Sequence, residues 1–174
     1  DVVGEAKYHY KNIKPPFTRE GVTCFKKDGK YYLLTSGMMG YVPNPSEIAV
    51  SENIEGPYEI LGDPHVDEKG ISSYNSQISC IFKHPNKDLY ISLADRWVPE
   101  FVVDKDVNDK LTRAIGSNYY KDLKASFKEK IWMTKSPLMG KANTSISDYV
   151  ILPITFEDNM PVIHWKDEWR LEDE

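Results

Sequence analysis

The sequence predicts an all-β protein built from two four-stranded antiparallel units, the second of which is interrupted by a partly helical insert. Short runs rich in β-branched and aromatic residues recur between turn residues, and they do not alternate with helices as the strands of a parallel sheet would. The first hairpin has an approximate copy further along the chain, where Cys80 takes the place of Cys24 and is again followed closely by Phe and Lys. This near-repeat indicates two copies of one sheet unit.

The first unit spans residues 20–62. Its first two strands are joined at Asp28-Gly29, a dipeptide typical of a two-residue hairpin turn, and Gly56-Pro57 introduces its last strand. Four strands in so short a stretch form one propeller blade or one antiparallel meander. We expect these strands at 21–27, 30–36, 47–51 and 57–61.

The second unit spans residues 76–170 and contains an insert from about 99 to 145. Apolar residues recur every four positions over 118–134, which predicts an amphipathic helix, and 108–113 is expected to form a short helical turn. A helix packed over the edge of the sheets is favoured over a partner-binding or membrane-surface element. We expect the four strands of this unit at 76–83, 88–94, 148–156 and 160–165.

Composition limits the function classes. With 174 residues and 40% hydrophobic content, the chain can bury a core and form one globular unit or part of one. Its formal net charge of -5 argues against a nucleic-acid partner. No apolar run approaches the roughly 18 residues that cross a bilayer, so no membrane partner is expected. The first residues lack the pattern of a signal peptide, which leaves open one already removed or lying upstream.

Cofactor chemistry is not indicated by the sequence. Cys24 and Cys80 are expected to be buried strand residues, since two cysteines form neither a disulfide framework nor a four-cysteine metal site. The four histidines are not at metal-ligand spacing. No metal and no cofactor are therefore predicted.

Eight short motifs occur in the order seen in glycoside hydrolase family 43, and the chain resembles that family over nearly its whole length except the insert. The resemblance is to the branch that contains exo-acting galactan β-1,3-galactosidases and related arabinofuranosidases. The motifs are Thr18 to Val22, Lys30 to Gly37, Gly40 to Asn44, Glu55 to Tyr58, Asn75 to Gln77, Asp95 to Trp97, Tyr149 to Ile154, and the pair Trp165 and Trp169.

The resemblance implies that the chain forms the last two blades of a five-bladed β-propeller that cleaves with inversion. Glu20 matches the general acid of the family, and Arg19 is given a supporting charge role at the substrate, although a nearby cation lowers the pKa of a carboxyl group. The alternative for Glu20 is an exposed glutamate at a strand edge.

The base of the reaction is the main departure from the family pattern. Members carry an aspartate base and a second, pKa-tuning aspartate well upstream of the acid, whereas only nineteen residues precede Glu20 here and Asp1 is their single aspartate. We therefore expect the acid-bearing C-terminal part of a longer module. The missing N-terminal blades, in the same chain or in a second one, are its expected partner.

Gln77 closes the Asn75-Ser76-Gln77 motif and lies at the catalytic centre in the galactosidase-like branch. An amide is a poor base, so positioning of water or a sugar hydroxyl is favoured over substitution for the base. A buried amide that satisfies backbone groups is the alternative, and Asn75 carries the same ambiguity.

Aromatic residues are candidates for sugar binding, because the apolar face of a pyranose stacks on a ring. Tyr41 and Trp97 are predicted platform residues, with a core role as the alternative for Trp97, and Tyr149 is expected to line the pocket. Trp165 and Trp169 are expected to make core contacts. Some family members hold calcium, but no local carboxylate cluster assigns a calcium site here.

Two function classes remain. The first is an inverting, exo-acting glycosidase that removes terminal galactosyl or arabinofuranosyl units from plant polysaccharide, here as its acid-bearing C-terminal part. The second is a non-catalytic carbohydrate-binding or structural propeller remnant. Location outside the cytoplasm, secreted or periplasmic, is expected from the family alone.

Overall fold

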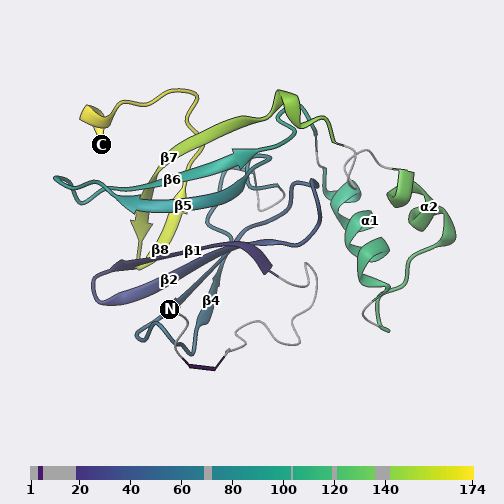
Figure 1. Cartoon of the computed structure of the whole chain (residues 1–174), viewed down its shortest axis with the longest axis horizontal. Coiled ribbons are helices and arrows are strands. Elements are labelled where there is room, and N and C mark those ends of the chain that lie inside the picture. Colours follow the sequence, from purple (N-terminus) through teal and green to yellow (C-terminus); the bar gives the residue numbers. More distant parts are fainter. Residues whose placement is uncertain (1–3, 6–18, 69–71, 103, 119–120, 136–141) are drawn as a thin grey trace.

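A computed structural model describes residues 4–5, 19–68, 72–102, 104–118, 121–135 and 142–174. Within them lie two four-stranded antiparallel sheets, with strand orders β1-β2-β3-β4 (sheet 1) and β5-β6-β7-β8 (sheet 2), so each strand pairs with its neighbours in the chain (Figure 1). The strands are β1 Arg19–Lys27, β2 Lys30–Gly37, β3 Glu47–Ser51, β4 Glu59–Gly62, β5 Gln77–Lys83, β6 Tyr90–Arg96, β7 Asp148–Glu157 and β8 Met160–Ile163. The all-β class is therefore confirmed, whereas the number of blades in a complete propeller stays a prediction.

Two hairpin turns have the same left-handed geometry. Asp28 and Gly29, between β1 and β2, have φ angles of 49° and 83°, and Asp158 and Asn159, between β7 and β8, have 48° and 72°. Positive φ at both central residues matches the right-handed twist of the flanking strands. The sequence signal at Asp28-Gly29 therefore gave the correct hairpin.

The apolar core lies between the two sheets. Phe25 of β1 stacks on Tyr32 of β2 at 5.1 Å, and the ring of Tyr90 from β6 lies 5.3 Å from that of Phe25. Because side chains alternate between the faces of a strand, every second residue reaches this core. Its other buried members include Leu34, Ile48, Ile78, Ile81, Val150, Leu152, Ile154 and Ile163.

The same alternation corrects the expectation for the cysteines. Cys24 lies in β1 and Cys80 in β5, and both are free thiols, but Cys24 is exposed and Cys80 is only partly buried. Their neighbours Phe25 and Ile81 occupy the core face. Each cysteine therefore lies on the face of its strand that points away from the core, and the prediction of buried cysteines was wrong.

The insert between β6 and β7 holds two helices, α1 Lys105–Gly116 and α2 Phe127–Lys135, and a 3₁₀ turn at Thr144–Ile146. A second 3₁₀ turn, Leu171–Asp173, lies near the end of the chain. The helix predicted over 118–134 was thus wrong at the described residues 118 and 121–126, while 119–120 lie outside the described residues. The short turn predicted at 108–113 belongs to a full helix. Local capping explains the boundaries.

Side chains at the start of each helix supply the caps. Asp104 accepts a hydrogen bond from the backbone N–H of Val107 and caps α1. Ser126 and Glu129 form a reciprocal capping box, since the Glu129 N–H donates to the Ser126 hydroxyl and the Ser126 N–H donates to the Glu129 carboxylate. This motif starts α2 at Phe127, later than the apolar period suggests.

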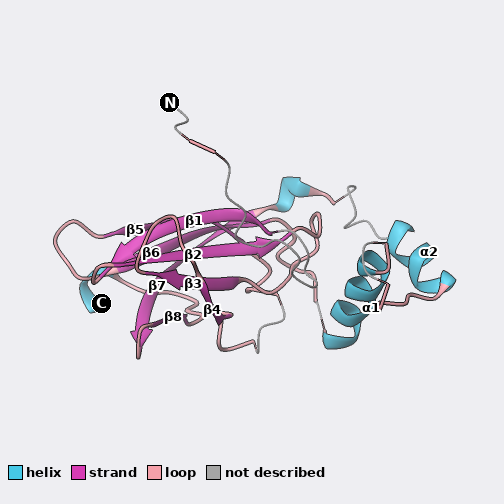
Figure 2. Ribbon diagram, turned by 90° about the horizontal axis from the view of Figure 1, so that it is seen from below, coloured by secondary structure: helices cyan, strands magenta, loops and turns pink. Residues whose placement is uncertain are grey.

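The helices lie together to one side of the sheets (Figures 1 and 2). Leu111 of α1 is fully buried against Met39 and Val42, which belong to the connection between β2 and β3. Partly buried side chains from α2 and from the start of the insert complete this second, smaller core. The insert thereby holds the β2–β3 connection, residues 38–46, in place.

We expect α2 to lose stability in acid. The backbone N–H of Ser126 and the guanidinium of Arg113 lower the pKa of Glu129 to about 2 from its ordinary 4.5. A carboxylate with a lowered pKa in the folded state stabilises that state above its unfolded pKa, and this contribution is lost as the pH falls from about 4.5 towards 2. Far-UV circular dichroism between pH 6 and 2 measures the loss. Glu129→Gln should lack this pH dependence, and an unchanged helical signal in the original chain would contradict the prediction.

Candidate functional site

Sheet 1 begins with an irregular strand segment that carries Glu20. Glu20 of β1 pairs with Ser36 of β2, and the ladder then shifts register between Glu20 and Thr23. Gly21, inside this irregularity, has a left-handed φ of 57°. Bulges of this kind re-aim nearby side chains.

Gln77, the first residue of β5, meets this segment from sheet 2. Its amide nitrogen Nε2 lies 3.2 Å from Oε1 of Glu20 and 3.2 Å from Oγ of Ser36, and it donates a hydrogen bond to each. The structure therefore brings together the carboxylate and the amide that the sequence analysis singled out, from two different sheets. Their catalytic roles stay predictions.

The close approach of the Gln77 side chain to β1 requires a glycine at position 21. A Cβ atom placed there would lie 2.9 Å from Cγ of Gln77 and 3.2 Å from the carbonyl oxygen of Ile78. The positive φ of Gly21 is also unfavourable for any side chain. Gly21 therefore serves both the backbone geometry of the bulge and the close approach of Gln77.

The segment just before Gln77 is a left-handed turn. Ser73, Tyr74 and Asn75 have φ angles of 53°, 58° and 57°. Three consecutive non-glycine residues in this region are unusual, and each is held there at a cost of about 1–3 kcal/mol. Strain of this kind persists only where the surroundings over-determine the conformation.

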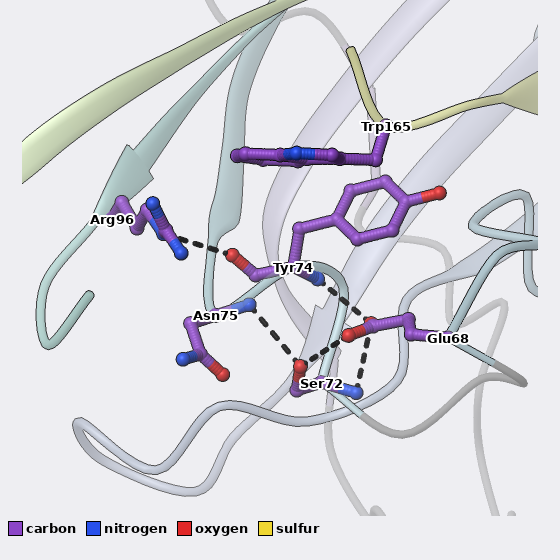
Figure 3. Close-up of a pocket in the computed structure, with 6 residues that line it drawn as sticks. All are labelled: Glu68, Ser72, Tyr74, Asn75, Arg96 and Trp165. Atoms are coloured by element: carbon purple, nitrogen blue, oxygen red, sulfur yellow. Dashed lines mark hydrogen bonds between the residues drawn. The ribbon is translucent and has the colours of Figure 1, made fainter. Parts of the chain in front are cut away.

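Glu68 is the main support of the turn (Figure 3). Its Oε1 accepts hydrogen bonds from the backbone N–H groups of Ser72 at 3.0 Å and Tyr74 at 2.7 Å, and its Oε2 accepts one from the Ser72 hydroxyl at 2.5 Å. The Ser72 oxygen in turn accepts the N–H of Asn75 at 3.2 Å. This carboxylate therefore acts as a structural clamp.

Contacts from sheet 2 hold the other side of the turn. Nε of Arg96 donates to the carbonyl oxygen of Tyr74 at 3.2 Å, and the guanidinium lies 5.1 Å from the ring of Trp165. The Tyr74 hydroxyl donates to the carbonyl of Ile163 at 2.8 Å, and burial raises the pKa of Tyr74, so the hydroxyl stays a neutral donor. Figure 3 shows these groups around one small hollow, lined by Glu68, Ser72, Tyr74, Asn75, Arg96 and Trp165.

A second small hollow adjoins the first and contains Gln77, and we call it the Gln77 hollow. Tyr41 and Trp97 lie at its side, edge to face, with ring centroids 5.9 Å apart. Both rings are partly exposed. The lining residues are Ser36, Gly40, Tyr41, Val42, Pro43, Asn44, Asn75, Ser76, Gln77 and Trp97.

Two asparagines fix the walls of the Gln77 hollow. Asn44 is buried and binds the backbone of Gly37 through both ends of its amide, at 2.8 and 3.1 Å. Asn75 donates from Nδ2 to the carbonyl oxygens of Pro99 at 3.3 Å and Phe101 at 2.5 Å. The side-chain nitrogen Nδ2 of Asn75 therefore holds the start of the insert. Among the described residues, no donor to the side-chain oxygen Oδ1 is found, so this atom can accept a hydrogen bond from a ligand.

Two predicted substrate-binding residues lie outside the Gln77 hollow. The Arg19 guanidinium donates to the hydroxyl of Thr35 at 2.9 Å and to its carbonyl at 2.9 Å. Tyr149 is 67% exposed and lines a separate hollow that also contains Trp165 and Trp169. The structure thus brings Gln77, Asn75, Tyr41 and Trp97 together around this hollow, joins Glu20 to them through its contact with Gln77, and places Arg19 and Tyr149 outside its lining.

Several residues of the site escaped the sequence reasoning. Ser36 carried a weak signal, since a hairpin turn at Asp28-Gly29 puts the end of the second strand opposite Glu20. Glu68 and Ser72 gave no sequence signal. Their partners are backbone groups of the turn at 73–75, and the residue types of this turn do not predict its left-handed backbone. Asn44 lay in a motif of the resemblance, but no role was attached to it.

Neither metal-binding nor membrane-spanning features were found in the described part of the chain. It contains no group of three or more His, Cys, Asp or Glu side chains placed to hold a metal ion. None of its helices is long and apolar enough to cross a membrane.

Comparison with solved structures finds folds similar to this chain in carbohydrate-cleaving enzymes. No family model matches the sequence, and no curated protein matches it. A β-1,3-galactosidase described as a GH43 enzyme is 28% identical, with a TM-score of 0.59 over 89% of this chain and 24% of its own. A second GH43 β-1,3-galactosidase, solved with galactodeoxynojirimycin, is 24% identical, with a TM-score of 0.60 over 88% of this chain and 32% of its own.

A xylan β-1,4-xylosidase from Bacillus halodurans shares the fold at 19% identity, with a TM-score of 0.54 over 95% of this chain and 26% of its own. The two β-1,3-galactosidases, whose names give the family GH43, confirm the resemblance to glycoside hydrolase family 43 that the sequence predicted. The chain spans between about a quarter and a third of the length of the two galactosidases.

Gly21→Ala should destabilise the chain by about 1–3 kcal/mol through its left-handed backbone, and by more through the clash with Gln77. Gly29→Ala is the matched control, because Gly29 also has a positive φ but a Cβ there would meet nothing within 4 Å. Urea denaturation of both variants measures the difference. Equal losses of stability would show that the approach of Gln77 to Gly21 is not a constraint.

Proposed function

We propose that the chain is the acid-bearing C-terminal part of an inverting, exo-acting glycoside hydrolase that removes terminal galactosyl or arabinofuranosyl units from plant polysaccharide. The observation that carries the proposal is the contact between Glu20 and Gln77, formed across two sheets whose arrangement is similar to that of GH43 enzymes. The adjoining Tyr41 and Trp97 rings suit the apolar face of a sugar.

In this proposal, Glu20 donates its proton to the glycosidic oxygen as the bond to the sugar breaks. Gln77 orients the water that attacks from the opposite side of the sugar carbon. An amide cannot take the proton of that water at neutral pH, so a carboxylate base must come from the part of the enzyme that precedes this chain. Asn75 and the aromatic pair bind the sugar.

A partner for sheet 1 is the second element of the proposal. Cys24, Leu33, Ala49 and Ile60 are successive cross-strand partners, and they form an apolar row over all four strands. The face they share points away from sheet 2, because their neighbours Phe25, Tyr32 and Ile48 occupy the core. On this face Ile60 is 46% exposed and Val22 is 58% exposed, whereas Ala49 is fully buried within the chain. We assign this face to the preceding blade of a propeller.

Glu20→Gln in the longer protein should reduce the turnover of substrates with poor leaving groups by about 10²- to 10⁴-fold, since the amide cannot donate a proton. Substrates with good leaving groups should lose less, and sugar affinity should hardly change. Glu59→Gln, an exposed strand glutamate of the same sheet, is the control. Unaltered turnover in Glu20→Gln would remove the acid assignment. Sugar binding without any turnover in the original protein would support a non-catalytic binding module instead.

Thiol labelling tests the preceding blade. In this chain, Cys24 should react with a maleimide, slowly because desolvation raises the pKa of its thiol. In this chain, a Cys80→Ser background limits the reaction to Cys24. In the longer protein, the same thiol should be protected, and mass spectrometry of the peptide that contains Cys24 measures its labelling. Equal labelling rates in both proteins would show that no sheet covers this face.

The family also suggests a place of action outside the cytoplasm, in the periplasm or the medium. Fractionation of cells that express the longer protein tests this element of the proposal.

A further inference from the structure

The amide group of Gln77 has its orientation set by two acceptors. Nε2 carries two N–H donors, and they go to Oε1 of Glu20 and Oγ of Ser36. The opposite orientation would place the amide oxygen against the Glu20 carboxylate, where two acceptors would repel each other. Within the described residues, no donor to the Gln77 oxygen is found, and Gln77 lines the hollow beside Tyr41 and Trp97.

Ser36 is placed to act as an acceptor for this amide. Its side chain is only 3% exposed, and its residue pairs with Glu20 in the ladder. The Ser36 hydroxyl donates its own hydrogen to the carbonyl oxygen of Gly37 at 3.4 Å, which leaves the lone pairs of Oγ for the N–H of Gln77. Without this hydroxyl, the second N–H of Gln77 would have no acceptor from β2.

We infer that Ser36 is a positioning residue that holds the Gln77 amide with its nitrogen on Glu20 and its oxygen free to accept a hydrogen bond from the attacking water. This inference rests on the proposed function. It separates the two roles weighed for Gln77, because an amide held in this way orients the water without removing its proton.

The hydrogen bonds of Gln77 also determine which of the two carboxyl oxygens of Glu20 carries the proton. The N–H of Gln77 donates a hydrogen bond to Oε1 of Glu20. Oε1 can accept this bond in both states of Glu20, because it is a carboxylate oxygen in the ionised form and the carbonyl oxygen in the protonated form. The proton that Glu20 donates is therefore carried on Oε2. One amide then orders both the proton donor and the water.

The length of the amide permits this double role. A side-chain amide with one hydrogen bond at its nitrogen and another at its oxygen bridges up to about 7 to 8 Å. Inverting enzymes hold the acid and base carboxyl groups about 6.5–9.5 Å apart, and the attacking water lies between the base and the sugar, nearer to the acid than the base is. A side chain at the position of Gln77 can therefore reach the carboxyl group and the water at once.

Side-chain amide spectra of this chain test the orientation without any activity. In a ¹⁵N-labelled sample, both N–H signals of Gln77 should be shifted from solvent-exposed values. Ser36→Ala should return one signal to an exposed value, and Glu20→Ala should return the other. Ser92→Ala is the matched control, since Ser92 is equally buried at 3% and its hydroxyl donates to Leu152 in sheet 2. Gln77 signals that are the same in Ser36→Ala and Ser92→Ala would overturn the inference.

Kinetics of the longer protein test the consequence. Ser36→Ala should lower kcat about 10-fold with little change in KM, Ser36→Thr should retain most activity through its hydroxyl, and Ser92→Ala should leave kcat unchanged. The double variant Ser36→Ala/Gln77→Ala should be no slower than Gln77→Ala alone. Losses that multiply would overturn the positioning role, because Ser36 would then act independently of Gln77. If the spectra behave as expected but the longer protein cleaves no glycoside, the proposed function fails and the orientation of the amide stands.

Discussion

The close approach of Gln77 to the backbone of β1 at Gly21 is the constraint on which the rest of the site depends. It joins the first strand of sheet 2 to the first strand of sheet 1 through hydrogen bonds to Glu20 and Ser36. The contact needs a glycine, because any Cβ at position 21 would overlap the Gln77 side chain. It also needs the bulge in β1, which places Ser36 rather than Gly37 opposite Glu20.

The two ends of the sheets differ in how they are held together. At the site, the left-handed turn at 73–75 is kept in place by polar contacts to Glu68 and Arg96. At the far end, Asp88 lies 2.9 Å from Lys27 and 2.7 Å from Lys83, and bridges the two sheets with ordinary ion pairs above the aromatic core. Left-handed non-glycine residues occur at both ends, in the hairpin turns at Asp28 and at 158–159 and in the turn at 73–75, but only the turn at 73–75 adjoins the candidate site.

The insert between β6 and β7 has no counterpart in the first four-stranded unit, and it packs beside the candidate site. It leaves sheet 2 at Trp97, and Leu111 packs against Met39 and Val42 on either side of Tyr41. The Tyr41 and Trp97 rings meet beside this packing, although Tyr41 lies in the β2–β3 connection of sheet 1 and Trp97 follows β6 of sheet 2. An insert of different length or packing would alter the wall of the Gln77 hollow.

The sequence by itself determined the eight strands and the Asp28-Gly29 turn, because alternation and turn residues are local properties. The candidate pair Glu20 and Gln77 came from the resemblance of short motifs to glycoside hydrolase family 43. The sequence did not determine the helix boundaries, which depend on capping side chains, or the outward faces of the cysteines. Only the tertiary structure decided that Ser36 holds Gln77, that Glu68 clamps the turn before it, and that Arg19 and Tyr149 lie outside the Gln77 hollow. Those contacts join residues whose partners are distant in sequence or are backbone groups, and such pairings leave no periodic trace in the chain.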